Sequence, residues 1–138
     1  LVLSTVIVGL ATVAGIKAFD ENRNQAAADA LNQRAATLAA DVKGIYEKPE
    51  QFGGLASDLS NVSTTEVTNK LGIPASGAVV PGASDGDTDA TCSVSAANSS
   101  NGIVIDCSGE GQFSNIEAYG VFNPGGNPEV SVQSTDPT

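Results

Sequence analysis

The chain has 138 residues, two cysteines, no histidine and a formal net charge of −10 at pH 7. Its length supports one ordinary domain beyond any extended segment, and its apolar fraction excludes both a disordered chain and a wholly membrane-embedded one. The lack of histidine excludes Ser-His-Asp and Cys-His catalysis, haem ligation by histidine and the usual zinc sites.

The first predicted element is an apolar helix that carries no charge before Lys17. A helix from the first residue to Phe19 would be about 28 Å long, which matches the hydrocarbon thickness of a bilayer. No basic segment precedes the apolar run, as one would in a secretory signal peptide. We therefore expect the run to be retained in the mature protein, with Leu1 as its processed N-terminus.

The same helix is predicted to continue through residues 20–48, where the only glycine is Gly44. Acids and bases balance over the whole predicted helix when Lys17 is counted with the bases of this region. Pro49 ends the helix near Lys48 because proline disfavours helical geometry before it. Apolar residues recur at intervals of three, four and seven, which places them in one stripe. We expect that stripe to pack against the rest of the protein through Ala27, Leu31, Leu38, Val42 and Ile45.

Residues 49–138 are predicted to form a globular head. A short helix is expected early in the head, because residues 63–66 read Ser-Thr-Thr-Glu, a capping box, and Gly72 is a stop signal. Val67 and Leu71 would face inward from this helix. Its position makes it a link between the long helix and the rest of the head.

The second part of the head is predicted to be an antiparallel sheet. Runs rich in β-branched residues alternate there with short glycine, proline, asparagine and aspartate clusters. One face of such a sheet needs a cover, and the apolar stripe of the long helix supplies it. The fold class is therefore α+β, with a protruding N-terminal helix packed on a small sheet. Strands are expected at 78–80, 91–96, 103–107, 112–122 and 129–133.

The head is strongly acidic, because its only base is Lys70 against eleven acids. Such a surface repels phosphates, so we expect the head to bind no nucleic acid. Its few aromatic residues are expected to belong to the core rather than to a binding site. They are Phe113, Tyr119 and Phe122 in the sheet, and Phe52 at the end of the long helix.

Two cysteines flank a predicted hairpin. Cys92 and Cys107 enclose two strand-like runs with turn residues between them, at 98–102. A disulfide at the base of this hairpin would stabilise the fold by about 3 kcal/mol in the chain-entropy model and would imply an oxidising compartment. Two free, buried thiols are the alternative, which a cytosolic location would favour.

This order of elements resembles the type IV pilins and their pseudopilin relatives. Those proteins begin with an apolar helix that continues as an amphipathic one and end in an antiparallel sheet, often closed by a disulfide. Residues 63–74 also resemble the segment that follows the long helix in type IVb pilins. The residues that resemble the type IVb N-terminus are Val6, Ile7, Val8, Leu10, Ala11, Ala14 and Gly15.

One position departs from the family pattern. Type IV pilins usually carry a glutamate at the fifth mature position, where it pairs with the amino terminus of a neighbouring subunit, whereas this chain has Thr5 and no acid before Asp20. An ammonium group at Leu1 would lie in an apolar bundle without a carboxylate, which is unfavourable. We expect the hydroxyls of Ser4 and Thr5, backbone carbonyls or N-methylation to reduce this penalty.

The resemblance implies a structural subunit of an extracellular, type IV pilus-like helical filament. Its partners would be further copies of itself, inner-membrane lipid before assembly, and the pilus assembly machinery. Outside lipid, so large an apolar surface must be buried against other copies, and Gly9 and Gly15 would let neighbouring helices approach closely. The residues expected in the filament core are Leu1, Leu3, Thr5, Val6, Ile7, Val8, Leu10, Val13 and Ile16.

Other functions compete with this hypothesis. The apolar run would equally suit a single-pass anchor for a periplasmic or surface binding domain, and the same layout would suit a secretion-system pseudopilin. An enzyme without histidine would need a carboxylate pair or a serine with Lys70, and no spacing favours either. We therefore expect neither catalysis nor a cofactor.

A weak candidate metal site lies in the head. Asp85, Asp87 and Asp89 place three carboxylates on alternate residues, which would suit calcium as oxygen ligands. The segment lacks the glycine and the final glutamate of an EF-hand loop. A solvated acidic turn is the favoured interpretation, so no metal is expected.

Overall fold

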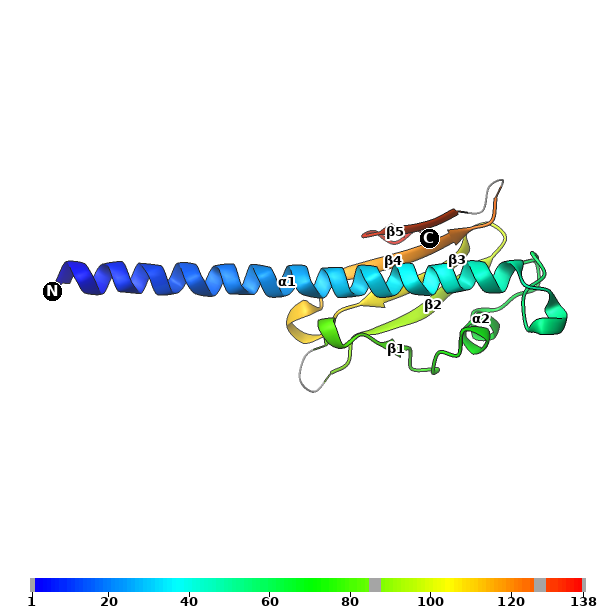
Figure 1. The fold of residues 1–138 in the computed structure, drawn as a ribbon, viewed down its shortest axis with the longest axis horizontal. Helices are drawn as coiled ribbons and strands as arrows, with labels where there is room; N and C mark the ends of the chain where they lie inside the picture. Colours follow the sequence, from blue (N-terminus) through cyan, green and yellow to red (C-terminus); the bar gives the residue numbers. More distant parts are fainter. Residues whose placement is uncertain (1, 85–87, 126–128, 138) are drawn as a thin grey trace.

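The computed structural model describes residues 2–84, 88–125 and 129–137. Its dominant element is α1 (Val2–Glu47), an uninterrupted helix of 46 residues. Figure 1 shows that the N-terminal half of α1 projects from one end of the head, while its C-terminal half lies across the sheet. The helix ends one residue before Lys48, as the following proline predicts.

The head contains a five-stranded sheet in the order β1-β2-β3-β4-β5, and every neighbouring pair is antiparallel. Each strand pairs with its neighbour in sequence, which short connections allow. The predicted α+β fold is therefore confirmed. The strands are β1 (Ala78–Val79), β2 (Thr91–Asn98), β3 (Gly102–Ser108), β4 (Glu117–Asn123) and β5 (Glu129–Gln133).

The core lies between α1 and one face of the sheet. Four residues of the predicted stripe, Ala27, Leu31, Leu38 and Val42, are buried there, and Ile45 is partly buried at the end of the stripe. Two further alanines of α1, at positions 35 and 39, are buried as well, although they were not among the predicted contacts. The buried sheet residues in this core include Ile103, Ile105, Cys107, Ala118 and Phe122.

The closest approach of α1 to the sheet is at Gly120 of β4. A Cβ at this position would collide with the backbone carbonyl of Ala35 and would lie 3.2 Å from the Cβ of Ala39. Glycine in a strand often marks such a close backbone approach. The small residues on α1 and the glycine on β4 together set the distance between the helix and the sheet.

The predicted short helix is confirmed as α2 (Thr64–Leu71). The Ser63 hydroxyl accepts a hydrogen bond from the backbone N–H of Glu66, and Gly72 closes the helix with a left-handed conformation at φ 72°. Val67 is buried and Leu71 is partly buried against the core. The cap and the inward-facing residues thus lie where the sequence predicts them.

The predicted strand at 112–122 is wrong in its first part. A 3-10 turn, η3 (Gly111–Phe113), precedes β4, and Gly111 has φ 61°, which a strand does not adopt. The backbone N–H of Gly109 donates to the carbonyl of Ile116 at 2.9 Å, so the intervening residues form a closed loop. This loop turns Phe113 under α1, where it is buried.

The prediction that Phe52 belongs to the core is also wrong. Its side chain is 69 % exposed, in the 3-10 turn η1 (Glu50–Phe52) that follows Pro49. Gly53 ends this turn at φ 83° and reverses the chain, and the backbone N–H of Leu55 then donates to the carbonyl of Ile45 at 2.9 Å. Leu55 takes the core position at the end of α1.

The predicted disulfide between Cys92 and Cys107 is present. The two residues lie directly opposite each other in the β2–β3 pair, with their Cα atoms 4.0 Å apart. At the other end of this hairpin, Asn98 accepts hydrogen bonds from the backbone N–H groups of Ser100 and Asn101. The hairpin is therefore fixed at both ends.

Gly120→Ala should lower the free energy of unfolding by about 1–3 kcal/mol, because the added methyl group overpacks the contact with α1. Urea unfolding of the detergent-solubilised full chain, followed by circular dichroism, measures this change. Gly44→Ala is the matched control, because nothing lies within 4 Å of its added Cβ. It should be neutral or stabilise the helix by up to about 1 kcal/mol. Equal effects of the two substitutions would contradict the close packing at Gly120.

Reduction of the disulfide should lower the free energy of unfolding by about 3 kcal/mol, because the unfolded chain then gains the freedom of the opened loop. The expected readout is a lower urea midpoint in the presence of dithiothreitol. A Cys92→Ala/Cys107→Ala variant serves as the control, since its midpoint should already be low and should not respond to the reductant. An unchanged wild-type midpoint would rule out a stabilising role.

Candidate assembly surface

The candidate functional site is the projecting part of α1, residues 2–19, which we call the apolar half. Every residue from 2 to 26 is exposed, although the first charge is at Lys17. Leu10, for example, is 68 % exposed. Such a contiguous apolar surface on a protein indicates contact with lipid or with other protein. The large exposed side chains are Val2, Leu3, Val6, Ile7, Val8, Leu10, Val13, Ile16 and Phe19.

The apolar half is apolar on all its faces. Val6, Ile7 and Val8 are consecutive, so their side chains point about 100° apart around the helix axis. A helix of this kind is normally buried in a protein core or in a membrane. By length and composition α1 has one segment able to cross a membrane, and none of that apolar window is buried within the molecule.

The two threonine hydroxyls of the apolar half bond within the helix. Thr5 Oγ1 donates to the carbonyl of Val2 at 2.8 Å, and Thr12 Oγ1 donates to the carbonyl of Val8 at 2.9 Å. A hydroxyl that is bonded to its own helix can enter an apolar environment without losing a hydrogen bond to water. These threonines therefore do not oppose burial of the segment.

Two glycines lie on the surface of the apolar half. No atom lies within 4 Å of a Cβ built at Gly9 or at Gly15, so the fold of the monomer does not require either glycine. Glycine lowers helix propensity by roughly 1 kcal/mol relative to alanine. Small residues on an apolar helix allow another helix to come close.

The apolar half is joined to the head by an aromatic and cationic contact. The Arg23 guanidinium carbon lies 5.7 Å from the centre of the Phe19 ring and 5.8 Å from that of Phe113. These distances suit cation–π attraction, which acts within about 6 Å. Phe113 of η3 thus lies against α1 near the point where the helix leaves the head.

The structure places most of the predicted filament-core residues on this exposed surface: Leu3, Thr5, Val6, Ile7, Val8, Leu10, Val13 and Ile16. Leu1, predicted as a core residue and as the processed N-terminus, lies outside the described residues. Val2 and Phe19 belong to the same surface and were not among the predicted residues, although the apolar run itself includes them. The contact of Arg23 with Phe113 carries no local sequence signal, because the two residues are far apart in the chain.

A second feature is the sheet face that points away from α1, where acids gather around Tyr119. The Tyr119 hydroxyl donates to Glu117 Oε2 at 3.0 Å, and burial together with this bond raises the pKa of Tyr119 to about 12. Burial, reinforced by the charges of Glu117 and Asp136, raises the pKa of Asp106 above its ordinary value. Asp106 Oδ1 is buried with no hydrogen-bond partner among the described residues.

Asp106→Asn should raise the free energy of unfolding near neutral pH. A carboxyl whose pKa is higher in the folded state favours folding while it is protonated, and that contribution is lost as the pH rises through the folded pKa. The gain should therefore vanish at about pH 3, where the carboxyl is protonated in both states. Urea midpoints of the variant and the wild type at the two pH values measure it.

Asp58→Asn is the control that should change the stability in the opposite direction. Hydrogen bonds from the backbone and side chain of Ser60 lower the pKa of Asp58, so its ionised form favours the fold. This substitution should lower the urea midpoint near neutral pH. A loss of stability in Asp106→Asn as well would contradict the account of the Asp106 carboxylate.

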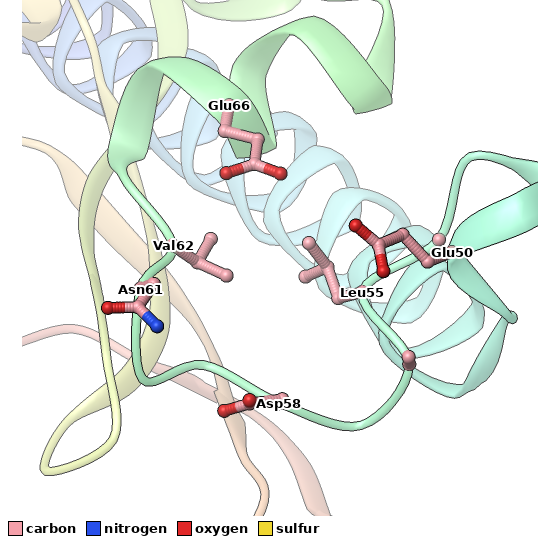
Figure 2. A pocket seen from close by; sticks show the side chains of 8 residues that line it. Glu50, Leu55, Asp58, Asn61, Val62 and Glu66 are labelled. Carbon is pink, nitrogen blue, oxygen red and sulfur yellow. The ribbon is translucent and has the colours of Figure 1, made fainter.

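A hollow of about 420 Å³ lies at the end of the head, between the loop after α1 and α2 (Figure 2). Carboxylates of Glu50, Asp58 and Glu66 surround it. Asp58 accepts a hydrogen bond from the Ser60 backbone N–H at 2.8 Å, and Glu66 lies 3.8 Å from the Lys70 ammonium. Two of the three acids thus have partners of their own, and no base or nucleophile joins them in the lining.

The weak calcium candidate receives no support from the described residues. Asp89 is exposed, while Asp85 and Asp87 lie outside the part of the chain that the structure describes. Within that part, no three acidic or cysteine side chains come together in a way that would hold a metal ion.

Comparisons of the chain with family models, with curated proteins and with solved structures give no match. The resemblance to type IV pilins accordingly rests on the residues and the order of elements described above. The candidate site is argued from the chain's own geometry: an exposed apolar half, an amphipathic half that covers the sheet, and a head closed by a disulfide.

Proposed function

We propose that this chain is a structural subunit of an extracellular, type IV pilus-like helical filament that polymerises through the apolar half of α1. Before assembly the apolar half would lie in the inner membrane, and the pilus assembly machinery would transfer the subunit into the filament. The single observation that carries the proposal is that the apolar half is exposed on every face while the head is complete without it.

The free energy available for polymerisation comes from the same surface. Burial of a large apolar side chain contributes about 1.5–3 kcal/mol, and nine such side chains are exposed on the apolar half. The head offers no cover, because its own core is filled by the second half of α1. In water the apolar half is therefore buried best against the same segment of other copies.

The amino terminus sets a further requirement on the filament. The chain has Thr5 where type IV pilins usually have a glutamate, and the Thr5 hydroxyl bonds back to its own helix. In the proposed filament, the ammonium group of Leu1 would be satisfied by backbone carbonyls and by the nearby hydroxyls, or its cost would be lowered by N-methylation. A carboxylate of another chain beside that nitrogen would contradict this part of the proposal.

Electron microscopy of material sheared from the cell surface, with mass spectrometry of its N-terminal peptide, tests the proposed function. We expect thin helical fibres that contain this chain with Leu1 as the first residue. Sheared material without such fibres, together with a chain that stays in the membrane fraction, would contradict the proposal.

A single-pass membrane anchor is the second candidate, because the apolar half is long and apolar enough to span a bilayer. The two functions need different things from Gly9 and Gly15. An anchor tolerates larger apolar residues at these positions, whereas helices that pack closely on one another do not. Substitution of the glycines therefore distinguishes the two.

Gly9→Leu/Gly15→Leu should leave membrane insertion and the head intact but reduce filament yield by about tenfold or more, because the larger side chains hold neighbouring helices apart. Membrane fractionation and the amount of sheared fibre measure the two effects. Val8→Leu/Val13→Leu is the control, since it changes large apolar residues for similar ones and should preserve both. A normal fibre yield in the glycine variant would contradict close packing of the apolar halves at Gly9 and Gly15. Loss of membrane insertion would show that the substitutions disturb the apolar half itself, so the comparison with an anchor would not hold.

A further inference from the structure

A helical polymer needs two different surfaces on each subunit that fit each other. Contacts of this heterologous kind propagate into open helices, whereas a surface that pairs with itself closes into a dimer. The apolar half alone does not define how neighbouring heads are oriented, because it is apolar on all faces. The distribution of charge on the head supplies two complementary surfaces.

The first surface is a basic seam on the side of the head that α1 covers. Arg34 lines a groove of about 460 Å³ between α1 and residues 79–82, and it is the only charged residue in that lining. The next groove along α1 is lined by Lys48 and Lys70, with Asp41 as its one acid. We call Arg34, Lys48 and Lys70 the basic seam.

The basic seam has unused binding capacity. Within the described residues the one ion pair is Lys70 with Glu66, so Arg34 and Lys48 have no acidic partner there. Arg34 Nε is moreover buried without a hydrogen-bond acceptor in that part of the chain. Lys48 is exposed and Arg34 as a whole is partly exposed, so a carboxylate of another copy can reach both side chains and form charge-assisted hydrogen bonds with them.

The second surface is the opposite face of the sheet. Asp106 of β3, Glu117 of β4 and Glu129 of β5 lie on the face away from α1, and Asp136 follows β5 close enough to affect Asp106. We call these four residues the acidic face. It has no base, because all six bases of the chain lie on α1, directly after it, or on α2.

We infer that the acidic face of one copy docks against the basic seam of the next copy and so orients the heads within the polymer. This inference rests on the proposed filament and adds the pair of surfaces that meet. The two surfaces lie on opposite sides of the head, so the contact repeats from copy to copy without closing. Charge complementarity of this kind fixes orientation and register more than it adds affinity.

A mutant cycle on the full-length chain tests the docking. Arg34→Gln/Lys48→Gln weakens the basic seam. Glu117→Gln/Glu129→Gln weakens the acidic face, and the amide oxygen that replaces the carboxylate can still accept the hydrogen bond from the Tyr119 hydroxyl. Assembly is started by removal of detergent, and the concentration needed for sedimentable fibres is measured at about 0.05 M and about 0.5 M NaCl.

At low salt each pair of substitutions should raise the required concentration about fivefold. The combined variant should need no more than either pair alone, because both pairs remove the same contact. High salt should abolish the difference between these variants and the wild type, because it screens the charges.

Control substitutions change charge outside both surfaces. Lys43→Gln and Glu47→Gln/Glu50→Gln should leave the required concentration unchanged at low salt. Lys48→Gln alone, at an exposed position, repeats the test without altering the partly buried Arg34. A smaller rise in the same direction is expected from it.

Two groups of results would overturn the inference. Additive effects of the two pairs, an effect of one pair only, or effects equal to those of the controls would show that the surfaces do not meet, while wild-type fibres would leave the proposed function standing. A wild-type chain that forms no fibres at either salt concentration and yields no fibres sheared from cells would overturn the proposed function and this inference together.

Discussion

The structure depends on one constraint: the two halves of a single continuous helix lie in different surroundings. The second half of α1 is amphipathic and fills the core with Leu31, Leu38 and Val42, so it needs nothing beyond its own head. The first half is apolar on all faces and receives no cover from the chain. A membrane or other copies of the chain would supply that cover, and this requirement is the basis of the proposal that the chain assembles with itself.

The two faces of the sheet differ in what they contact and in the charges they carry. One face carries Gly120 and lies very close to α1, which presents the small residues Ala35 and Ala39 at this contact. The other face carries Tyr119 with several acids, which destabilise one another and lack a neutralising base. All six bases lie on α1, directly after it, or on α2, whereas the charged residues of this sheet face are all acids. Contact between copies through these two sides would relieve the unfavourable charge.

Local chemistry predicts the elements of this fold well, and non-local contacts limit what it predicts. The extent of α1, the Ser63 cap and the opposed cysteines follow from residues that are close in sequence. The loop before β4 is not predicted because Phe113 packs in the core against residues that are far from it in the chain. Phe52 is wrongly assigned to the core because nothing in the sequence shows that Leu55 takes that position. Glycine in a strand is the one available signal for the close approach at β4.

In the proposed filament, the apolar half of α1 is buried against the apolar halves of other copies. Helical reconstruction of the assembled fibre by cryo-electron microscopy tests it most directly, because it shows what surrounds residues 2–19 of each subunit. We expect a central bundle in which these segments contact one another, with the heads outside. Fibres held together by their heads alone, with residues 2–19 facing solvent or detergent, would contradict it.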